Sequence, residues 1–292
     1  MKVAIVANTK KVKPKQVQAL QRALRDAGVT SIERREISKG SAATKEAKKA
    51  LKHGADVVVA CGGDGTVRAA AQALVGSDAA LAVLPAGTAN LFASALSIGD
   101  DPSDLAGLIA GDVRRVLDTG RCNDLTFNVM AGAGFDAAMI DDADEHKERL
   151  GMLSYIRASA KAAPERKPFD MSVRIDGDTG FEGAASCILV GNIGTLKGGL
   201  EAFPDSSPTD GLLDVAVLSA SGLRDWANLM FSAVRHRQQL NGHAQLWTGK
   251  EVTVKTGAKH RFELDGGVKG TADRLDFEIV PASLRVCAPA AD

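Results

Sequence analysis

Two patterns of apolar positions divide the chain near residue 120. Before that point, unbroken apolar runs at 3–7, 57–61 and 81–84 alternate with stretches in which apolar residues recur at helical spacing. Unbroken runs are typical of strands that are buried on both faces. Their alternation with helices predicts a parallel sheet whose strands are joined by crossover helices.

From about residue 127 the pattern changes to strict alternation of apolar and polar residues. The apolar members of these segments are Met171, Val173 and Ile175; Val252 and Val254; Phe262 and Leu264; and Leu275, Phe277 and Ile279. A period of two predicts antiparallel strands with one buried face. Two helical stretches, 150–163 and 223–240, interrupt this part. The second half is therefore expected to be mainly antiparallel β structure.

A glycine-rich loop follows the buried strand at 57–61. It places Gly62, Gly63 and Gly65 around Asp64, and Thr66 comes next at the start of an alanine-rich helical stretch. Glycines let the backbone amides approach a ligand closely, and a helix N-terminus favours an anion. Thr66 is expected to cap the helix or to offer its hydroxyl to a phosphate. The loop predicts a phosphate site, and the alternative is a tight turn that only packs against the sheet.

Asp64 favours the phosphate interpretation. A carboxylate among phosphate-facing amides would repel the ligand unless a cation or a transferred proton accompanies it, which suits magnesium-nucleotide chemistry. A second polar loop, Pro85–Asn90, follows the next buried strand. Polar loops at two strand ends indicate a nucleotide site.

The two loops resemble motifs of the diacylglycerol kinase catalytic-domain family, which includes bacterial lipid kinases and is related to sphingosine and ceramide kinases. The family's Gly-Gly-Asp-Gly-Thr stands here at 62–66, and its Pro-x-Gly-Thr-x-Asn stands at 85–90. Three further segments, 128–136, 204–215 and 264–266, match in the family's order. The matches cover nearly the whole chain.

The resemblance implies an α/β fold with two domains. An N-terminal Rossmann-like nucleotide-binding domain with a parallel sheet would span 1–121, and a C-terminal antiparallel β-sandwich that binds lipid would span 122–282. The final strand, 283–288, would return to the first domain. The implied activity is an ATP- and Mg²⁺-dependent kinase acting on the hydroxyl of a diacylglycerol-like or sphingoid-like lipid. The nucleotide would contact Gly62, Gly63, Asp64, Gly65, Thr66, Thr88 and Asn90.

The resemblance also implies a structural magnesium site at Asp210, with the main-chain carbonyls of Ser207 and Leu212. One carboxylate with carbonyls and waters is an acceptable oxygen set for Mg²⁺. By its own composition, the segment 206–211 predicts a β-turn in which the aspartate bonds to the local backbone.

Three departures from the family pattern concern acidic residues. Arg68 and Ala69 stand where bacterial members commonly have Asn-Glu, and Leu91 stands where they commonly have Asp. The family's C-terminal Asp-Gly-Glu ends here in Gly267, and its glutamate is usually assigned as the proton acceptor. The resemblance therefore leaves two candidates for the catalytic base, Asp265 and Asp64.

Composition is typical of a soluble enzyme. The chain has 36 basic and 36 acidic residues, so no global field recruits nucleic acid, and membrane contact is expected to be local and transient. No apolar run approaches the roughly 18 residues of a membrane span, and the first strand follows a single lysine, so no leader is expected. We expect a cytoplasmic protein, peripheral at the membrane during turnover, with a homodimer as a possible assembly. No two of the four cysteines have the spacing of zinc ligands, so a zinc site is not expected.

Two alternatives remain open. A NAD kinase shares the Gly-Gly-Asp-Gly-Thr motif and the two-domain plan, but its usual Asn-x-Gly-x-x-Gly-Phe segment is replaced here by the 85–90 loop. A catalytically weak lipid- or nucleotide-binding homologue would account for Gly267 and Leu91.

Overall fold

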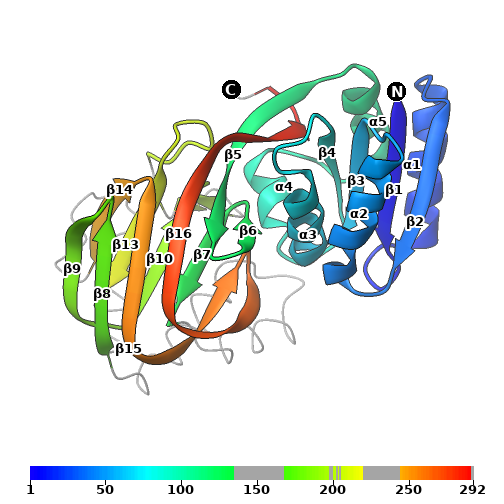
Figure 1. Ribbon diagram of the computed structural model, residues 1–292. Helices are drawn as coiled ribbons and strands as arrows, with labels where there is room; N and C mark the ends of the chain where they lie inside the picture. Colours follow the sequence, from blue (N-terminus) through cyan, green and yellow to red (C-terminus); the bar gives the residue numbers. More distant parts are fainter. Residues whose placement is uncertain (135–167, 197–199, 202, 204, 220–243, 291–292) are drawn as a thin grey trace. The chain divides into compact units, whose positions relative to one another are not determined.

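The computed structural model describes residues 1–134, 168–196, 200–201, 203, 205–219 and 244–290. The chain divides into two units: unit 1 comprises Met1–Thr119 and Pro281–Asp292, and unit 2 comprises Gly120–Val280. The helices expected at 150–163 and 223–240 lie outside the described residues. Figure 1 labels the elements of both units.

The sheet of unit 1 is parallel. Its order is β16-β4-β3-β1-β2, and all four neighbouring pairs are parallel. The strands are β1 (Lys2–Asn8), β2 (Ser31–Ile37), β3 (Val57–Gly62), β4 (Ala80–Pro85) and the last residues of β16 (Gly267–Cys287). β3 and β4 are buried along their whole length, as the unbroken apolar runs predict. The end of β16 joins this sheet where Arg285 and Val286 pair with Ala80 and Leu81.

Helices cover both faces of this sheet (Figure 1). They are α1 (Pro14–Asp26), α2 (Ala43–Lys52), α3 (Asp64–Leu74), α4 (Leu91–Ala95) and α5 (Pro102–Ala110), with a 3₁₀ turn at Gly40–Ala42. α1 and α5 share one core cluster with β1, β3 and β4, while α2 packs on α3. In α1 the apolar residues Val17, Leu20 and Leu24 recur every three or four positions, so one stripe of the helix is buried.

Unit 2 is antiparallel. Its strands are β6 (Leu125–Phe127), β7 (Met130–Ala133), β8 (Phe169–Ile175), β9 (Asp178–Ala185), β10 (Cys187–Gly191), β11 (Thr195–Leu196), β12 (Leu200–Glu201), β13 (Leu213–Leu218), β14 (Ala244–Gly249), β15 (Glu251–Leu264) and most of β16. β5 (Arg114–Cys122) begins in unit 1 and ends in unit 2, where it pairs with β6.

Two layers enclose the core of unit 2 because β15 pairs with different strands along its length. Residues 252–256 pair with β8, whereas residues 262–264 pair with β7, which continues through β10 and β13 to β14. The inward residues of both layers form one buried cluster, in which Phe127 and Phe277 meet edge to face with ring centroids 6.3 Å apart. The apolar positions predicted from the alternating pattern are thus buried in the described strands, except Phe262, which is partly buried.

Candidate active site

The two glycine loops lie beside each other in unit 1 because β3 and β4 are neighbours. Gly62 pairs with Pro85 at the ends of these strands, and the Ala86 amide donates to the Gly62 carbonyl at 2.9 Å. These are the carboxyl ends of parallel strands, the edge at which open α/β sheets bind ligands.

The loops touch backbone to backbone through two glycines. A Cβ built on Gly87 would lie 2.6 Å from the Cα of Gly63 and 2.8 Å from Oδ1 of Asn90. A Cβ on Gly63 would lie 3.0 Å from the Cα of Gly87. Any larger residue at Gly87 would force the loops apart, so sterics select glycine here. Gly65 differs, because a Cβ there would meet nothing within 4 Å.

Asp64 lies next to the second loop. It is the first residue of α3, and its carboxylate is close to the backbone amides of Leu91, Phe92 and Asn90 at the start of α4. Burial raises the pKa of Asp64, and these amides oppose the shift. The carboxylate predicted to work with a nucleotide thus lies where the two loops meet.

Asn90 and Thr88 lie in the second loop. Asn90 has a left-handed backbone, with φ at 50°, a conformation that asparagine tolerates better than most residues. Its Oδ1 accepts from the Gly87 amide at 2.8 Å, and its Nδ2 donates to the Gly87 carbonyl at 2.9 Å. Asn90 therefore closes the loop on itself, while Thr88 is exposed on it.

Thr66 is not the helix cap that the sequence suggested. The N-cap position of α3 belongs to Gly63, and Thr66 is the third helical residue. Its side chain is 2 % exposed, and its Oγ1 accepts from Nδ2 of Asn8 at 3.1 Å. A Cβ on Gly62 would lie only 2.6 Å from this oxygen. Thr66 thus packs the end of β1 against the first loop, and its hydroxyl is turned into the fold.

The start of α3 offers an amide to an anion. Thr66 and Val67 donate their amides to the Gly63 carbonyl, but no described residue accepts a hydrogen bond from the amide of Gly65. An unpartnered first-turn amide and the positive end of the helix dipole favour a phosphate.

Asp265, the other predicted catalytic carboxylate, lies in unit 2. It is 4 % exposed, and φ at this residue is 47°. Its Oδ1 accepts from the amides of Val129 at 2.8 Å, Asn128 at 3.2 Å and Met130 at 3.2 Å, and its Oδ2 accepts from Asn128 at 2.9 Å. Its own amide donates to the Met130 carbonyl at 2.8 Å. These bonds fix the segment that leads into β7, and both oxygens are engaged.

Glu263 is a titratable residue that the sequence did not single out. It lies on β15 between Phe262 and Leu264, which the alternating pattern assigns to the buried face. The residue between them is therefore expected to face solvent, but Glu263 is only 8 % exposed. Burial raises the pKa of Glu263 to about 7; the nearby Asp265 adds to the shift, and Lys269 opposes it. The available signal was an acidic residue two positions before Asp265.

Asp210 lies in the exposed turn before β13. Its Oδ1 accepts from the Leu212 amide at 2.9 Å, and its own amide is 3.5 Å from the Ser207 carbonyl. Burial raises the pKa of Asp214; the nearby Ser206 side chain opposes the shift, and the carboxylates of Asp210 and Asp205 add to it.

Residues Ser207, Asp210 and Leu212 fit the hard oxygen chemistry of Mg²⁺. The structure brings these predicted ligands into one turn, and Oδ2 of Asp210 accepts no hydrogen bond from the described residues. Neighbouring carboxylates make a cation electrostatically favourable there. Among the described residues, however, no group of three or more histidine, cysteine or acidic side chains could hold a metal ion, so the set depends on main-chain oxygens.

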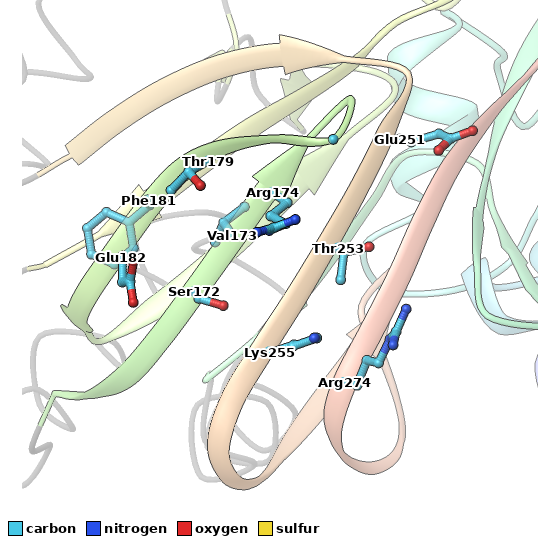
Figure 2. Close-up of a pocket in the computed structure, with 11 residues that line it drawn as sticks. Ser172, Val173, Arg174, Thr179, Phe181, Glu182, Glu251, Thr253, Lys255 and Arg274 are labelled. Atoms are coloured by element: carbon cyan, nitrogen blue, oxygen red, sulfur yellow. The ribbon is translucent and has the colours of Figure 1, made fainter.

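A hollow of about 570 Å³ lies on the outer face of β8, β9, β15 and β16 (Figure 2). Its charged side chains are of both signs: Arg174, Lys255, Arg274, Glu182 and Glu251. None of the residues predicted for the nucleotide, the base or the metal lines it. The mixed charge is typical of the solvated face of an antiparallel sheet.

Comparison with known proteins agrees with this architecture. Residues 2–122 match the model of the diacylglycerol kinase catalytic domain, and residues 129–288 match the YegS C-terminal NAD kinase beta sandwich-like domain. The chain belongs to the diacylglycerol kinase catalytic-domain family. The family resemblance inferred from the sequence is thereby confirmed, as is the fold class of a parallel α/β domain followed by a β-sandwich.

Two relatives carry lipid kinase names. The diacylglycerol kinase of Bacillus subtilis is 30% identical over 232 residues, which cover 78% of this chain and 76% of that protein. The YegS-like lipid kinase of Klebsiella pneumoniae is 31% identical over 297 residues, covering 98% and 95%. A Synechocystis relative is 33% identical over 241 residues, and there the match spans only 55% of the relative. The chain is thus a member of a phosphotransferase family.

Solved structures share the fold. A diacylglycerol kinase from Bacillus anthracis superposes with a TM-score of 0.76 at 19% identity, covering 99% of this chain and 97% of that one. A NAD kinase from Archaeoglobus fulgidus in complex with ATP gives a TM-score of 0.56 at 14% identity, covering 98% and 93%. At these identities the likeness concerns the fold alone.

Proposed function

We propose that this chain is an ATP-dependent kinase that transfers a phosphoryl group to the hydroxyl of a diacylglycerol-like or sphingoid-like lipid. The observation that carries the proposal is the pair of adjoining loops, in which Gly63 meets Gly87 and the Asp64 carboxylate lies near the first amides of α4. The family's named relatives support a lipid rather than a dinucleotide as the acceptor.

Unit 1 would bind the nucleotide. Phosphoryl transfer depends mainly on positioning and on neutralising charge. The glycine loops let main-chain amides approach the phosphates, with Gly65 at the start of α3 offering an unpartnered donor and Thr88 an exposed hydroxyl. The Asp64 carboxylate lies where the two loops meet, close to the amides at the start of α4.

Mg²⁺ would supply positive charge to the phosphates and, in unit 2, would stabilise the turn formed by Ser207, Asp210 and Leu212. We assign unit 2 to the lipid, since its fold has a continuous apolar interior and the family's second domain lies there. None of the described helices is long and apolar enough to cross a bilayer. We infer that the lipid is reached by transient contact with a membrane surface.

To test the proposal, purified protein is incubated with ATP and Mg²⁺, and phosphate transfer to each of several acceptors is measured. The acceptors are diacylglycerol, monoacylglycerol, ceramide and sphingosine in mixed micelles, and NAD as the rival acceptor. We expect phosphate transfer to one lipid class and none to NAD. Asp64→Ala should lower turnover at least tenfold, whereas Asp26→Ala, an exposed carboxylate at the end of α1, should not.

Transfer to NAD but to no lipid would replace the proposal with the NAD kinase alternative. Nucleotide binding without transfer to any acceptor would identify a binding homologue instead. Either result would refute the lipid kinase assignment.

A further inference from the structure

The hollow on the outer face of unit 2 (Figure 2) depends on the register of β8, β15 and β16. On β15, Lys255 lies opposite Ser172 of β8 on one side and opposite Arg274 of β16 on the other. Two residues earlier on β15, Thr253 lies opposite Arg174 of β8. The residues between them along these strands belong to the buried core, so these side chains share the outer face.

The cations of this face differ in whether they have a partner. Arg274 donates from Nε and Nη2 to the Asp276 carboxylate at 2.9 Å and 3.0 Å, and Thr253 donates to the same group at 2.9 Å. No described residue forms an ion pair or a hydrogen bond with the side chain of Arg174 or of Lys255. Lys255 also faces Arg274 directly, and like charges opposite each other destabilise a sheet. A bound anion would offset this repulsion.

Ser172, Arg174 and Lys255 form a triangle of hydrogen-bond donors. Ser172 and Arg174 are two residues apart on β8, and Lys255 lies opposite the serine and diagonal to the arginine. Side chains at opposed and diagonal positions begin roughly 5 to 8 Å apart, so an arginine and a lysine can reach one anion between them. A guanidinium fork binds two oxygens of a phosphate, and an ammonium and a hydroxyl can bind further oxygens. The triangle therefore suits a single phosphate group.

Glu182 places a carboxylate beside this triangle. It lies on β9 opposite Ser172, on the side away from Lys255, and no described residue forms an ion pair with it. Glu251, the other carboxylate of the hollow, lies four residues along β15 from Lys255. A ligand with only negative charge is repelled by Glu182, whereas a ligand that carries an ammonium group close to its phosphate satisfies both the donors and the carboxylate. A hollow of about 570 Å³ is large enough for such a ligand, since small-molecule sites measure roughly 300 to 1,000 Å³.

We propose that the hollow binds a zwitterionic group made of a phosphate and a primary ammonium joined by a short carbon link. Arg174, Lys255 and Ser172 hold the phosphate, and Glu182 accepts hydrogen bonds from the ammonium. Phosphoethanolamine has this chemistry, both as the headgroup of a membrane phospholipid and as a free compound. The site lies wholly in unit 2 and needs neither nucleotide nor phosphoryl transfer, so it goes beyond the kinase activity proposed above.

Binding of the free compound is measured by ligand-detected NMR on the full chain without ATP, at low ionic strength. Phosphoethanolamine should bind about tenfold more tightly than inorganic phosphate or ethanolamine, because each of these offers only one of the two charges. Arg174→Gln and Lys255→Gln should each weaken phosphoethanolamine binding about tenfold, and Glu182→Gln should remove its advantage over phosphate. The matched control is Lys259→Gln, which should bind as wild type does, because Lys259 is an exposed residue of β15 outside the hollow.

Sedimentation with vesicles tests the membrane source of the headgroup. Wild type should bind vesicles of phosphatidylcholine that contain phosphatidylethanolamine. It should bind less to pure phosphatidylcholine, and less to phosphatidylcholine that contains phosphatidylglycerol in the same proportion. Arg174→Gln and Glu182→Gln should lose the binding, and free phosphoethanolamine should compete with it. Binding of the free compound without binding of the vesicles would support the site and assign it to free phosphoethanolamine.

Equal affinity for phosphate and phosphoethanolamine in wild type would overturn the proposal. Unchanged binding in both Arg174→Gln and Lys255→Gln would overturn it too, because the ligand would then lie outside the hollow. A preference for phosphatidylglycerol vesicles in wild type and Glu182→Gln alike would show attraction by negative charge alone, which also contradicts it. None of these measurements uses ATP, so each of these results leaves the lipid kinase assignment intact.

Discussion

The burial of Glu263 predicts a pH dependence of stability that can be measured without any substrate. Its pKa is about 7 in the folded protein against an ordinary value of 4.5. The folded chain therefore binds a proton between these values that the unfolded chain has released. By linkage, the free energy of unfolding must fall as pH rises through this window.

The magnitude follows from the size of the shift. Each pKa unit is worth about 1.4 kcal/mol. The full difference between the folded and unfolded pKa values of Glu263 therefore lowers the free energy of unfolding by roughly 3 kcal/mol above pH 7 and by nearly nothing below pH 4.5. Between pH 5 and pH 8, Glu263 should remove about 2 to 3 kcal/mol from the stability of unit 2. Glu263→Gln has no charge to bury at this position, so its free energy of unfolding should lack this pH-dependent loss.

Guanidinium unfolding of wild type and Glu263→Gln at pH 5 and pH 8 would measure the effect. Both tryptophans of the chain fall within the range of unit 2, so their fluorescence follows the unit that contains Glu263. Other groups with raised pKa values, Asp64 and Asp214, affect both proteins alike and cancel in the difference. Identical pH dependence of the two proteins would show that the Glu263 carboxyl is not held in an unfavourable environment.

Three further predictions concern stability and metal binding. Asp265→Ala should lower the free energy of unfolding by about 3 kcal/mol or more, because three amides lose a charged acceptor; chemical denaturation with an unchanged midpoint would refute this. Gly87→Ala should destabilise unit 1 by about 1 to 3 kcal/mol through contact with the Gly63 backbone, whereas Gly65→Ala should not; equal midpoints for the two variants would contradict the packing argument. Asp210→Asn should abolish the rise in melting temperature that Mg²⁺ gives the wild type. An equal rise in both proteins would refute the metal site at Asp210.

Local patterns predicted the framework. The buried strands at 3–7, 57–61 and 81–84 lie within β1, β3 and β4, because an unbroken apolar run determines burial without reference to distant residues. β2 was missed, since its sequence Ser-Ile-Glu-Arg-Arg-Glu-Ile carries charges suited to the edge of a sheet. The glycine loops were predicted because the conformational freedom of glycine is a property of the residue itself.

The surroundings of the carboxylates were decided by tertiary structure alone. The sequence identified Asp64 and Asp265 as candidates, but only the fold shows that Asp265 binds amides 135 to 137 positions away along the chain. It likewise buries Glu263, which an alternating strand would expose, because the end of β15 lies between β7 and β16. A sequence states which groups can ionise. Their affinity for a proton depends on desolvation and on hydrogen bonds from distant segments, and only the folded chain determines these.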